Sequence, residues 1–217
     1  MPVARSDVDL LKDQPPRILA MGDSLLAWNR PVGRSISDNV ETRLGVPVVD
    51  RSVIGARMLY ALPISGALGL NISKQYLKDD WDWVIINGGG NDLWFGCGCV
   101  ACDRKIDKMV TSDGTSGAIP DLVAKLRNNG ARVLYLGYLR TPGKGSLIDH
   151  CANEGAAFEA RLETMAKRDN GVYFMSLTDL VPVNDLSLHD FDRIHPSQKG
   201  SSKIGARIAA FIRSKDT

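Results

Sequence analysis

Short runs of apolar residues recur along the chain, and several of them end at a glycine. The runs occupy residues 17–21, 46–53, 83–86, 132–137 and 172–175. Continuous rather than alternating apolar runs are typical of strands in a parallel sheet that is covered on both faces. The pattern therefore predicts five buried parallel strands.

The segments between these runs carry apolar residues at helical spacing. Helices are predicted over residues 37–44, 119–129 and 147–167, and a terminal helix around Ile204, Ile208 and Ile212. The clearest is 147–167, where apolar residues follow a 3,4,3,4,3 spacing. Strands that alternate with helices indicate a doubly wound α/β fold. We expect one domain over 1–217, a three-layer α/β/α sandwich with a five-stranded parallel, flavodoxin-like sheet, and residues 1–16 as an extended segment.

Composition and charge exclude several classes of protein. The chain has 217 residues, 44% hydrophobic and 24% charged, which is typical of a soluble globular protein. Its 27 basic and 25 acidic residues give a net charge of +2, so nothing indicates a nucleic-acid partner. No apolar run approaches the ~18 residues that a membrane span requires. Residues 1–16 lack a signal-peptide core, so an exported protein would have lost its signal already.

The first three predicted strands each end at a glycine-bearing turn. These turns contain Gly22, Gly55 and the run 88–90. In doubly wound sheets, ligands bind beyond the carboxyl ends of the strands. The three turns therefore predict one binding site at this edge of the sheet.

Two short signatures near the ends of the chain contain the groups needed for acyl transfer. Ser24 follows the first strand, and Asp192 precedes His195 by three residues. A serine hydroxyl requires a base to deprotonate it, and a carboxylate can hold that base in the required tautomer. Alternatively, Asp23 and Ser24 only cap a helix, and His195 is an ordinary loop histidine.

Other side chains near His195 could compete for these roles. His189 lies on the same loop, and Asp185 and Asp190 are alternative carboxylates at less suitable spacing. Neither His189 nor His150 is assigned a catalytic role.

The turns after the second and third strands offer donors for an oxyanion. Asn91 has a neutral amide that can donate to an oxygen on which negative charge develops. Gly55 can offer a backbone N–H. The alternative is that both residues only form turns.

The order of these signatures resembles the SGNH hydrolases, also called GDSL esterases or lipases. The resemblance rests on Gly22-Asp23-Ser24-Leu25, Gly55, Gly89-Gly90-Asn91-Asp92 and Asp192-x-x-His195, and it covers nearly the whole chain. A G-x-S-x-G elbow, which would indicate an α/β-hydrolase, does not surround Ser24.

The resemblance implies a role for each matching residue. Ser24 would be the nucleophile and the first oxyanion donor, and Gly55 and Asn91 would be the second and third donors. His195 would be the base and Asp192 the group that orients it. The loop that begins Cys97-Gly98-Cys99 is a departure from the family pattern, and it affects the expected substrate side of the site rather than the triad.

Four residues near these motifs are candidates for the substrate pocket. They are Trp28, Arg57, Trp94 and Phe95. Aromatic side chains can line an acyl or a sugar pocket, and they can equally belong to the core.

The four cysteines are clustered, and they predict two disulfides. Cys97, Cys99 and Cys102 lie close together, and Cys151 lies about fifty residues later. Because Cys97 and Cys99 are too close in sequence to bond each other readily, we expect one to pair with Cys102 and the other with Cys151. A structural metal held by the four sulfurs is the second alternative and reactive thiols the third.

These observations predict a serine hydrolase that cleaves carboxylic esters through an acyl-enzyme. We expect short acyl groups such as acetyl, because no long apolar insertion is visible, and we expect no cofactor or metal. An O-acyltransferase that acts on a saccharide, and an inactive carbohydrate-binding relative, are the rival hypotheses. The substrate would be a small-molecule or saccharide ester, and clustered cysteines favour a periplasmic or secreted protein. The sequence leaves the oligomeric state open.

Overall fold

Five parallel strands form one sheet in the order β2-β1-β3-β4-β5 in this computed structural model, which describes residues 17–143 and 145–216. The strands are β1 Ile18–Met21, β2 Val48–Asp50, β3 Trp83–Asn87, β4 Arg132–Leu136 and β5 Val172–Met175. This order is that of flavodoxin-like sheets, so the predicted fold class is confirmed. The segment 1–16, expected to be extended, lies outside the described residues.

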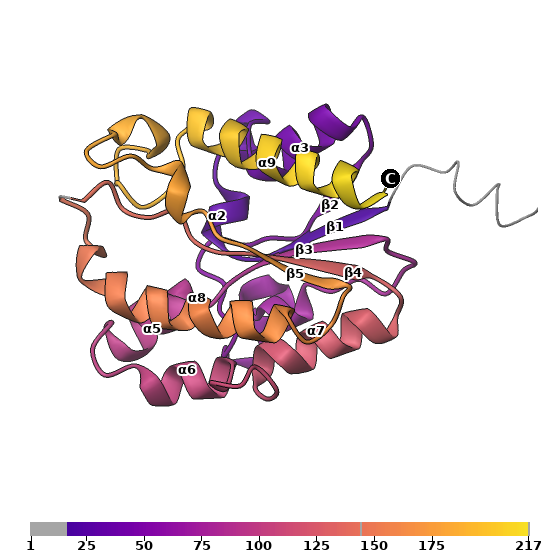
Figure 1. The fold of residues 1–217 in the computed structure, drawn as a ribbon, viewed down its shortest axis with the longest axis horizontal. Helices are drawn as coiled ribbons and strands as arrows, with labels where there is room; N and C mark the ends of the chain where they lie inside the picture. Colours follow the sequence, from indigo (N-terminus) through magenta and orange to yellow (C-terminus); the bar gives the residue numbers. More distant parts are fainter. Residues whose placement is uncertain (1–16, 144, 217) are drawn as a thin grey trace, which may run out of the picture.

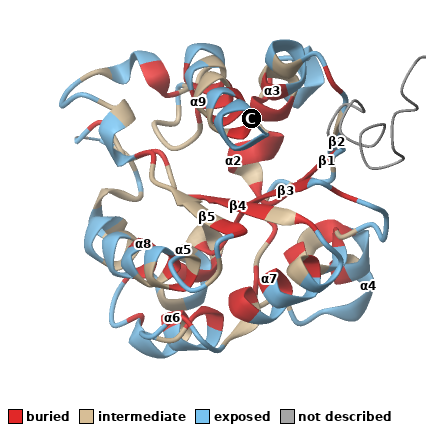
Figure 2. Cartoon of the chain, turned by 45° about the vertical axis from the view of Figure 1, so that its right-hand side comes forward, coloured by how far each residue is buried: buried red, intermediate tan, exposed pale blue. Residues whose placement is uncertain are grey.

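Alternate residues of each strand face opposite sides of the sheet, and both sides are buried in the central strands β1, β3 and β4, whereas the edge strands β2 and β5 are more exposed. In β1, Leu19 and Met21 belong to one hydrophobic core, whereas Ile18 and Ala20 belong to the other. Successive side chains of a strand point to opposite faces, so a strand with two buried faces needs apolar residues at every position. Figure 2 shows the strands as a buried layer between helices. Burial on both faces explains why these strands appear in the sequence as continuous apolar runs.

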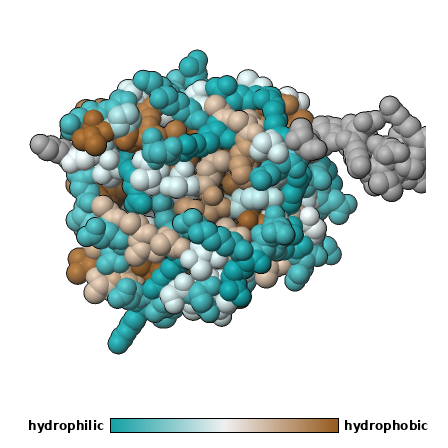
Figure 3. Space-filling model, in the orientation of Figure 1, coloured by the Kyte–Doolittle hydropathy of each residue, from teal (hydrophilic) through white to brown (hydrophobic). Residues whose placement is uncertain are grey.

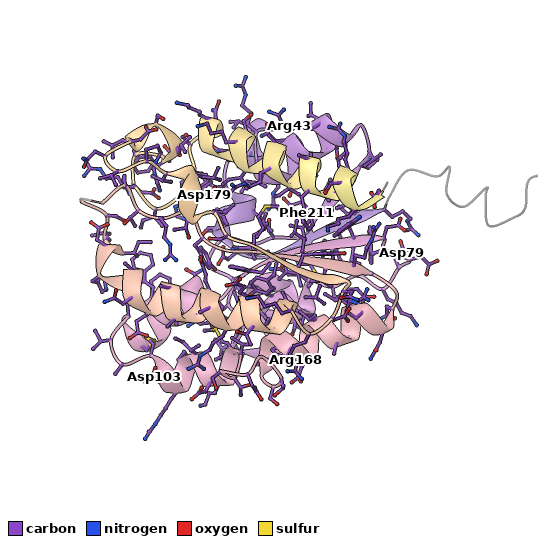
Figure 4. All side chains as sticks on the ribbon, viewed as in Figure 1. Arg43, Asp79, Asp103, Arg168, Asp179 and Phe211 are labelled. Atoms are coloured by element: carbon purple, nitrogen blue, oxygen red, sulfur yellow. A yellow bond between two sulfur atoms is a disulfide. The ribbon has the colours of Figure 1, made fainter. Side chains whose placement is uncertain are left out.

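Helices cover both faces of the sheet. The helices α2 and α3, with α9, pack on one face, and α5 to α8 pack on the other (Figure 1). Their bounds are α2 Ser24–Ala27, α3 Ile36–Leu44, α4 Pro63–Ser65, α5 Gly90–Cys97, α6 Asp103–Met109, α7 Ala118–Asn128, α8 Ala152–Ala166 and α9 Gln198–Asp216. In Figure 4, Phe211 lies between α9 and the sheet, where its ring contacts those of Trp83 and Tyr173.

The predicted helices are present, with small differences at their ends. The segment predicted as a helix over 147–167 begins as a short 3-10 helix, Asp149–Cys151, before α8. The segment around the first three cysteines is more ordered than a loop, because Cys97 ends α5 and Cys102 is the N-cap of α6. The pattern missed these two helices because each is eight residues or shorter.

The carboxyl ends of the strands meet at one end of the molecule, on the left in Figure 1. Hydrophobic surface also appears at this end, above and below the level of the sheet (Figure 3). Across residues 17–143 and 145–216, no helix combines the length and apolar character that crossing a membrane requires.

Candidate active site

A sharp turn after β1 presents Ser24. Asp23 is the N-cap of α2, its Oδ1 accepts a hydrogen bond of 3.0 Å from the backbone N–H of Leu25, and Ser24 is the first residue of the helix. Gly22 allows the close approach of β1 to β3, because a Cβ at this position would lie 2.7 Å from the carbonyl oxygen of Asn87. Ser24 is therefore partly exposed at the edge of the sheet, while Asp23 is buried.

Gln75 holds this turn from the side, a role that the sequence did not suggest. Its Oε1 accepts a bond of 2.7 Å from the N–H of Gly22, and its Nε2 donates a bond of 2.8 Å to the carbonyl of the same residue. Nε2 also donates to the carbonyl of Gly69. A buried polar side chain is costly unless it is hydrogen-bonded, and Gln75 meets this condition by fixing the backbone next to the nucleophile.

Asp23 belongs to a second buried network that runs beneath the site. The hydroxyl of Tyr138 donates to Asp23 Oδ2 at 2.5 Å and accepts a bond of 2.8 Å from the N–H of Gly90. Burial raises the pKa of Asp23, although the bonds from Tyr138 and Leu25 oppose this rise. Burial also raises the pKa of Tyr138 well above its ordinary value, so its hydroxyl stays protonated and able to donate.

Two candidate oxyanion donors lie across from Ser24. Gly55 has a φ of +79°, which glycine adopts readily, and no bond among the described residues uses its N–H. Asn91 lies in the first turn of α5, and its Nδ2 donates a bond of 3.0 Å to the carbonyl of Ala56. An amide nitrogen has two hydrogens, so the second remains available to a ligand.

Asp92 connects the turn that contains Gly55 to α5. Its carboxylate accepts bonds of 2.8 Å and 2.9 Å from the backbone N–H groups of Met58 and Leu59. Burial raises the pKa of Asp92, and these two bonds oppose the rise. The position of the turn relative to α5 therefore depends on this buried carboxylate together with the bond from Asn91 to the carbonyl of Ala56.

His195 is held by Asp192, three residues before it, and both residues lie in the turn that precedes α9. His195 Nδ1 and Asp192 Oδ2 lie 2.5 Å apart, and Asp192 Oδ1 accepts bonds of 3.0 Å from the N–H groups of Ile194 and His195. Burial raises the pKa of Asp192, but the bonds from His195 and Ile194 outweigh it and lower the pKa below its ordinary value. Asp192 is thus a carboxylate at neutral pH.

Trp28 stacks on the imidazole of His195. The two ring centroids are 3.8 Å apart and the ring planes differ by 6°. The indole N–H of Trp28 donates a bond of 2.7 Å to Asp190 Oδ2. The backbone N–H of Trp28 donates to the carbonyl of Ser24, so one turn of helix connects the candidate nucleophile to the ring that supports the candidate base.

One cavity of about 360 Å³ adjoins these residues. Ser24, Gly55, Asn91 and His195 all line it, and Asp192 lies behind His195. Of the four residues considered for the substrate pocket, Trp94 and Phe95 line the cavity.

The other two pocket candidates lie outside the set of lining residues. Trp28 is held against His195, as described above. Arg57 packs with its guanidinium 5.0 Å from the ring centre of Tyr60. The sequence pattern could not separate these positions from those of Trp94 and Phe95, because all four follow a site motif closely.

The competing histidines do not line the cavity. His189 is buried, and burial lowers its pKa, opposed by the carbonyl of Arg140 and by the charges of Asp192 and Asp185. His150 Nε2 lies 3.8 Å from the sulfur of Cys151.

Both predicted disulfides are present. Cys97 is bonded to Cys102, and Cys99 is bonded to Cys151, so the alternative left open by the sequence is resolved. Among the described residues, one group has metal-ligand spacing, namely Cys99, His150 and Cys151. Its two sulfurs are joined to each other, and a disulfide is not the thiolate that binds zinc.

Comparison with known proteins defines the class of this chain. The model of the GDSL-like lipase/acylhydrolase family matches residues 20–203, so the chain belongs to this family. The family is one of acylhydrolases, and hydrolase chemistry agrees with the site described above. No curated protein matches the chain.

Solved structures show the same fold at low sequence identity. A GDSL-like lipase from Bacteroides thetaiotaomicron is similar with a TM-score of 0.63 and 18% identity, over 93% of this chain and 89% of that one. The psychrotrophic esterase EstA from a Pseudoalteromonas species, inhibited by monoethylphosphonate, is similar with a TM-score of 0.59 and 18% identity, over 92% of this chain and 97% of that one.

Proposed function

We propose that this protein hydrolyses carboxylic esters through an acyl-enzyme formed on Ser24. The observation that carries the proposal is the convergence of Ser24, Asn91 and His195 on one cavity, with Asp192 bonded to His195 Nδ1. These residues come from the ends of β1 and β3 and from the loop before α9. Nucleophile, base and oxyanion donor are the groups that acyl transfer requires.

In the first half of the reaction, Ser24 Oγ attacks the ester carbonyl carbon and its proton moves to His195 Nε2. The bond between Nδ1 and Asp192 keeps Nε2 free to accept this proton. The N–H groups of Ser24 and Gly55 and the Nδ2 of Asn91 donate to the oxyanion. When the tetrahedral intermediate collapses, the carbon–oxygen bond breaks and the alcohol leaves with the proton from His195.

In the second half, water replaces the alcohol. His195 removes a proton from the water, the hydroxide attacks the acyl carbon, and the acid leaves as Ser24 regains its proton. A saccharide hydroxyl in place of water would make the protein an acyltransferase. Analysis of products from an acetylated substrate with added saccharide distinguishes the two reactions, and we expect free acid.

A fluorophosphonate probe tests the nucleophile. We expect the probe to label the wild type and the Ser202→Ala variant, whose serine bonds Arg43 on the surface, but not Ser24→Ala. We also expect Ser24→Ala and His195→Ala to lower kcat on p-nitrophenyl acetate by roughly four to six orders of magnitude. A folded wild type that the probe does not label would overturn the proposal.

The sequence predicts that the acyl group of the substrate is short. That expectation rested on the lack of a long apolar insertion. The cavity contains apolar side chains from several separate segments, so a pocket exists without an insertion.

An oxidising compartment, the periplasm or the exterior of the cell, is the environment that we propose for this protein. Two disulfides support it, because disulfides persist in such compartments and are rare in the cytosol. Alkylation of thiols at the moment of cell lysis, followed by intact mass, provides the test. Four alkylated cysteines in freshly lysed native cells would contradict the proposal.

A further inference from the structure

Residues of α5 and α8, two helices that run in opposite directions, line the cavity. At one end, α5 begins beside Phe158 of α8, since a Cβ at Gly89 would lie 2.5 Å from Phe158 Cζ. At the other end, Cys99 follows α5 and is bonded to Cys151, which directly precedes α8. The candidate catalytic groups Asn91 and Ser24 lie at the first end, and the disulfide lies at the second.

The length of α5 sets the distance between the two ends. Asn91 and Cys97 are six residues apart in this helix, and a rise of 1.5 Å per residue makes that about 9 Å. An extended carbon chain advances about 1.2 Å per bond, as a protein main chain does. An acyl chain of roughly seven or eight bonds would therefore reach from the ester carbon to the disulfide.

The walls of the cavity are largely apolar, and two small residues widen it. The α8 residues that line the cavity include Ala152, Gly155 and Phe158, which lie on one face of the helix. The acidic residues Asp23 and Glu159 and the basic residue Arg140 also line the cavity. Arg140 and Glu159 form an ion pair of 3.1 Å, and Asp23 accepts bonds from Tyr138 and Leu25. An aliphatic chain can therefore enter without leaving a buried charge unpaired.

The volume of the cavity agrees with the acyl chain length that the length of α5 allows. A cavity of about 150 Å³ holds a six-carbon ring such as benzene. By the same measure, a cavity of about 360 Å³ has room for an aliphatic chain of roughly six to ten carbons together with the ester group. An acetyl group would leave most of this apolar surface uncovered.

We propose that the substrate is an ester of a medium-chain fatty acyl group, and that the Cys99–Cys151 disulfide closes the far end of the acyl pocket and limits the chain length. This inference rests on the proposed ester hydrolysis at Ser24. Cys99 is buried, and its bond to Cys151 joins the loop after α5 to the residue that precedes α8. Without the bond, the loop relaxes and the pocket lengthens.

The chain-length profile of the wild type is the first test. With p-nitrophenyl esters from acetate to myristate below their critical micelle concentrations, we expect kcat/KM to rise about fourfold for each added methylene. The rise ends at about eight carbons, and longer chains react more slowly. A profile that is flat, or that is highest at acetate, contradicts the inference.

Two double variants test the disulfide, with the other disulfide of the same loop as the matched control. We expect Cys99→Ser with Cys151→Ser to move the maximum of the profile toward longer chains by two carbons or more. Cys97→Ser with Cys102→Ser should leave the maximum in place, because neither residue lines the cavity. If both pairs move the maximum equally, or neither moves it, the disulfide is not the limit.

A third variant keeps the test decisive if the first double variant does not fold. Ala152→Trp leaves both disulfides intact and fills the cavity beside Cys151. We expect it to lower kcat/KM for octanoate tenfold or more while the value for acetate stays within twofold. Equal losses for both esters would contradict the pocket assignment.

Active-site titration with the fluorophosphonate separates the two proposals. An enzyme that is fully labelled at Ser24 but insensitive to acyl length would overturn the medium-chain inference and leave ester hydrolysis standing. A wild type that is not labelled would overturn the hydrolase proposal itself.

Discussion

At the scale of single residues, a side chain outside the candidate triad holds the candidate base in position. Trp28 was a candidate for either the substrate pocket or the core, and its ring lies flat against His195. In the proposed mechanism the imidazole takes the proton of Ser24 and becomes a cation, and an aromatic face attracts a cation. The stacked indole would therefore stabilise this intermediate and restrict rotation of the imidazole ring.

Replacement of Trp28 tests this role. We expect Trp28→Ala to lower kcat by about two- to thirtyfold, from a cation–π contribution of about 0.5–2 kcal/mol, with KM changed less than twofold. Trp28→Phe keeps an aromatic face and should recover most of the loss. A change confined to KM would indicate instead that Trp28 binds substrate.

His189 gives a prediction for stability rather than catalysis. Burial lowers its pKa below the 6.5 of an exposed histidine. Below about pH 6.5 the unfolded chain therefore binds a proton that the folded chain binds less readily, and the free energy of unfolding falls by up to about 1.4 kcal/mol per pH unit. Urea unfolding at pH 7 and pH 5 should show a smaller fall for His189→Gln than for the wild type.

The same variant separates the two histidines as candidate bases. His189 does not line the cavity, so His189→Gln should keep at least half of the wild-type kcat on p-nitrophenyl acetate at pH 7.5. His195→Gln should lose several orders of magnitude. A larger loss for His189→Gln would show that the base was assigned to the wrong residue.

At the scale of elements, the turn between β1 and α2 depends on a glycine that lies very close to β3. We expect Gly22→Ala to destabilise the fold by about 1–3 kcal/mol, because the added methyl group would meet the carbonyl of Asn87 at 2.7 Å. It should also displace Ser24 and lower kcat. Gly155→Ala is the control for stability, since its methyl group would meet only Arg140 Nη1 at 3.3 Å. Equal urea midpoints for the two variants would contradict this account.

Most elements could be predicted from hydrophobic spacing, and the exceptions have a common cause. The strands were visible as continuous apolar runs, and the helices α3, α7, α8 and α9 each have enough residues for a helical period to be visible. The helix α2 has four residues and α5 has eight, and in each case two residues separate the helix from the strand before it. Their position is decided by the turns at Gly22 and Gly89 rather than by an apolar stripe.

At the scale of the whole molecule, the two disulfides close loops of very different length. Cys99–Cys151 spans 52 residues and Cys97–Cys102 spans 5. On the loop-entropy model, removal of the longer bridge costs roughly 4 kcal/mol and removal of the shorter one roughly 2 kcal/mol. Urea unfolding of the two double serine variants measures both values. Equal losses, or a larger loss for the shorter bridge, would show that native contacts rather than loop entropy decide the effect.

The sequence by itself determined the fold class, the family, the clustering of the cysteines and the residues expected to form the site. These properties depend on local pattern: apolar periodicity, glycine at strand ends, and short motifs in a fixed order. Only the tertiary structure decided which cysteines pair, that Trp28 supports His195, and that Gln75 and Tyr138 fix the turns around Ser24. Each of these contacts joins residues far apart in the chain, and local spacing carries no information about which distant side chains the packed sheet brings together. Only the tertiary structure decided the cavity as well, because its walls come from the separate elements α2, α5 and α8.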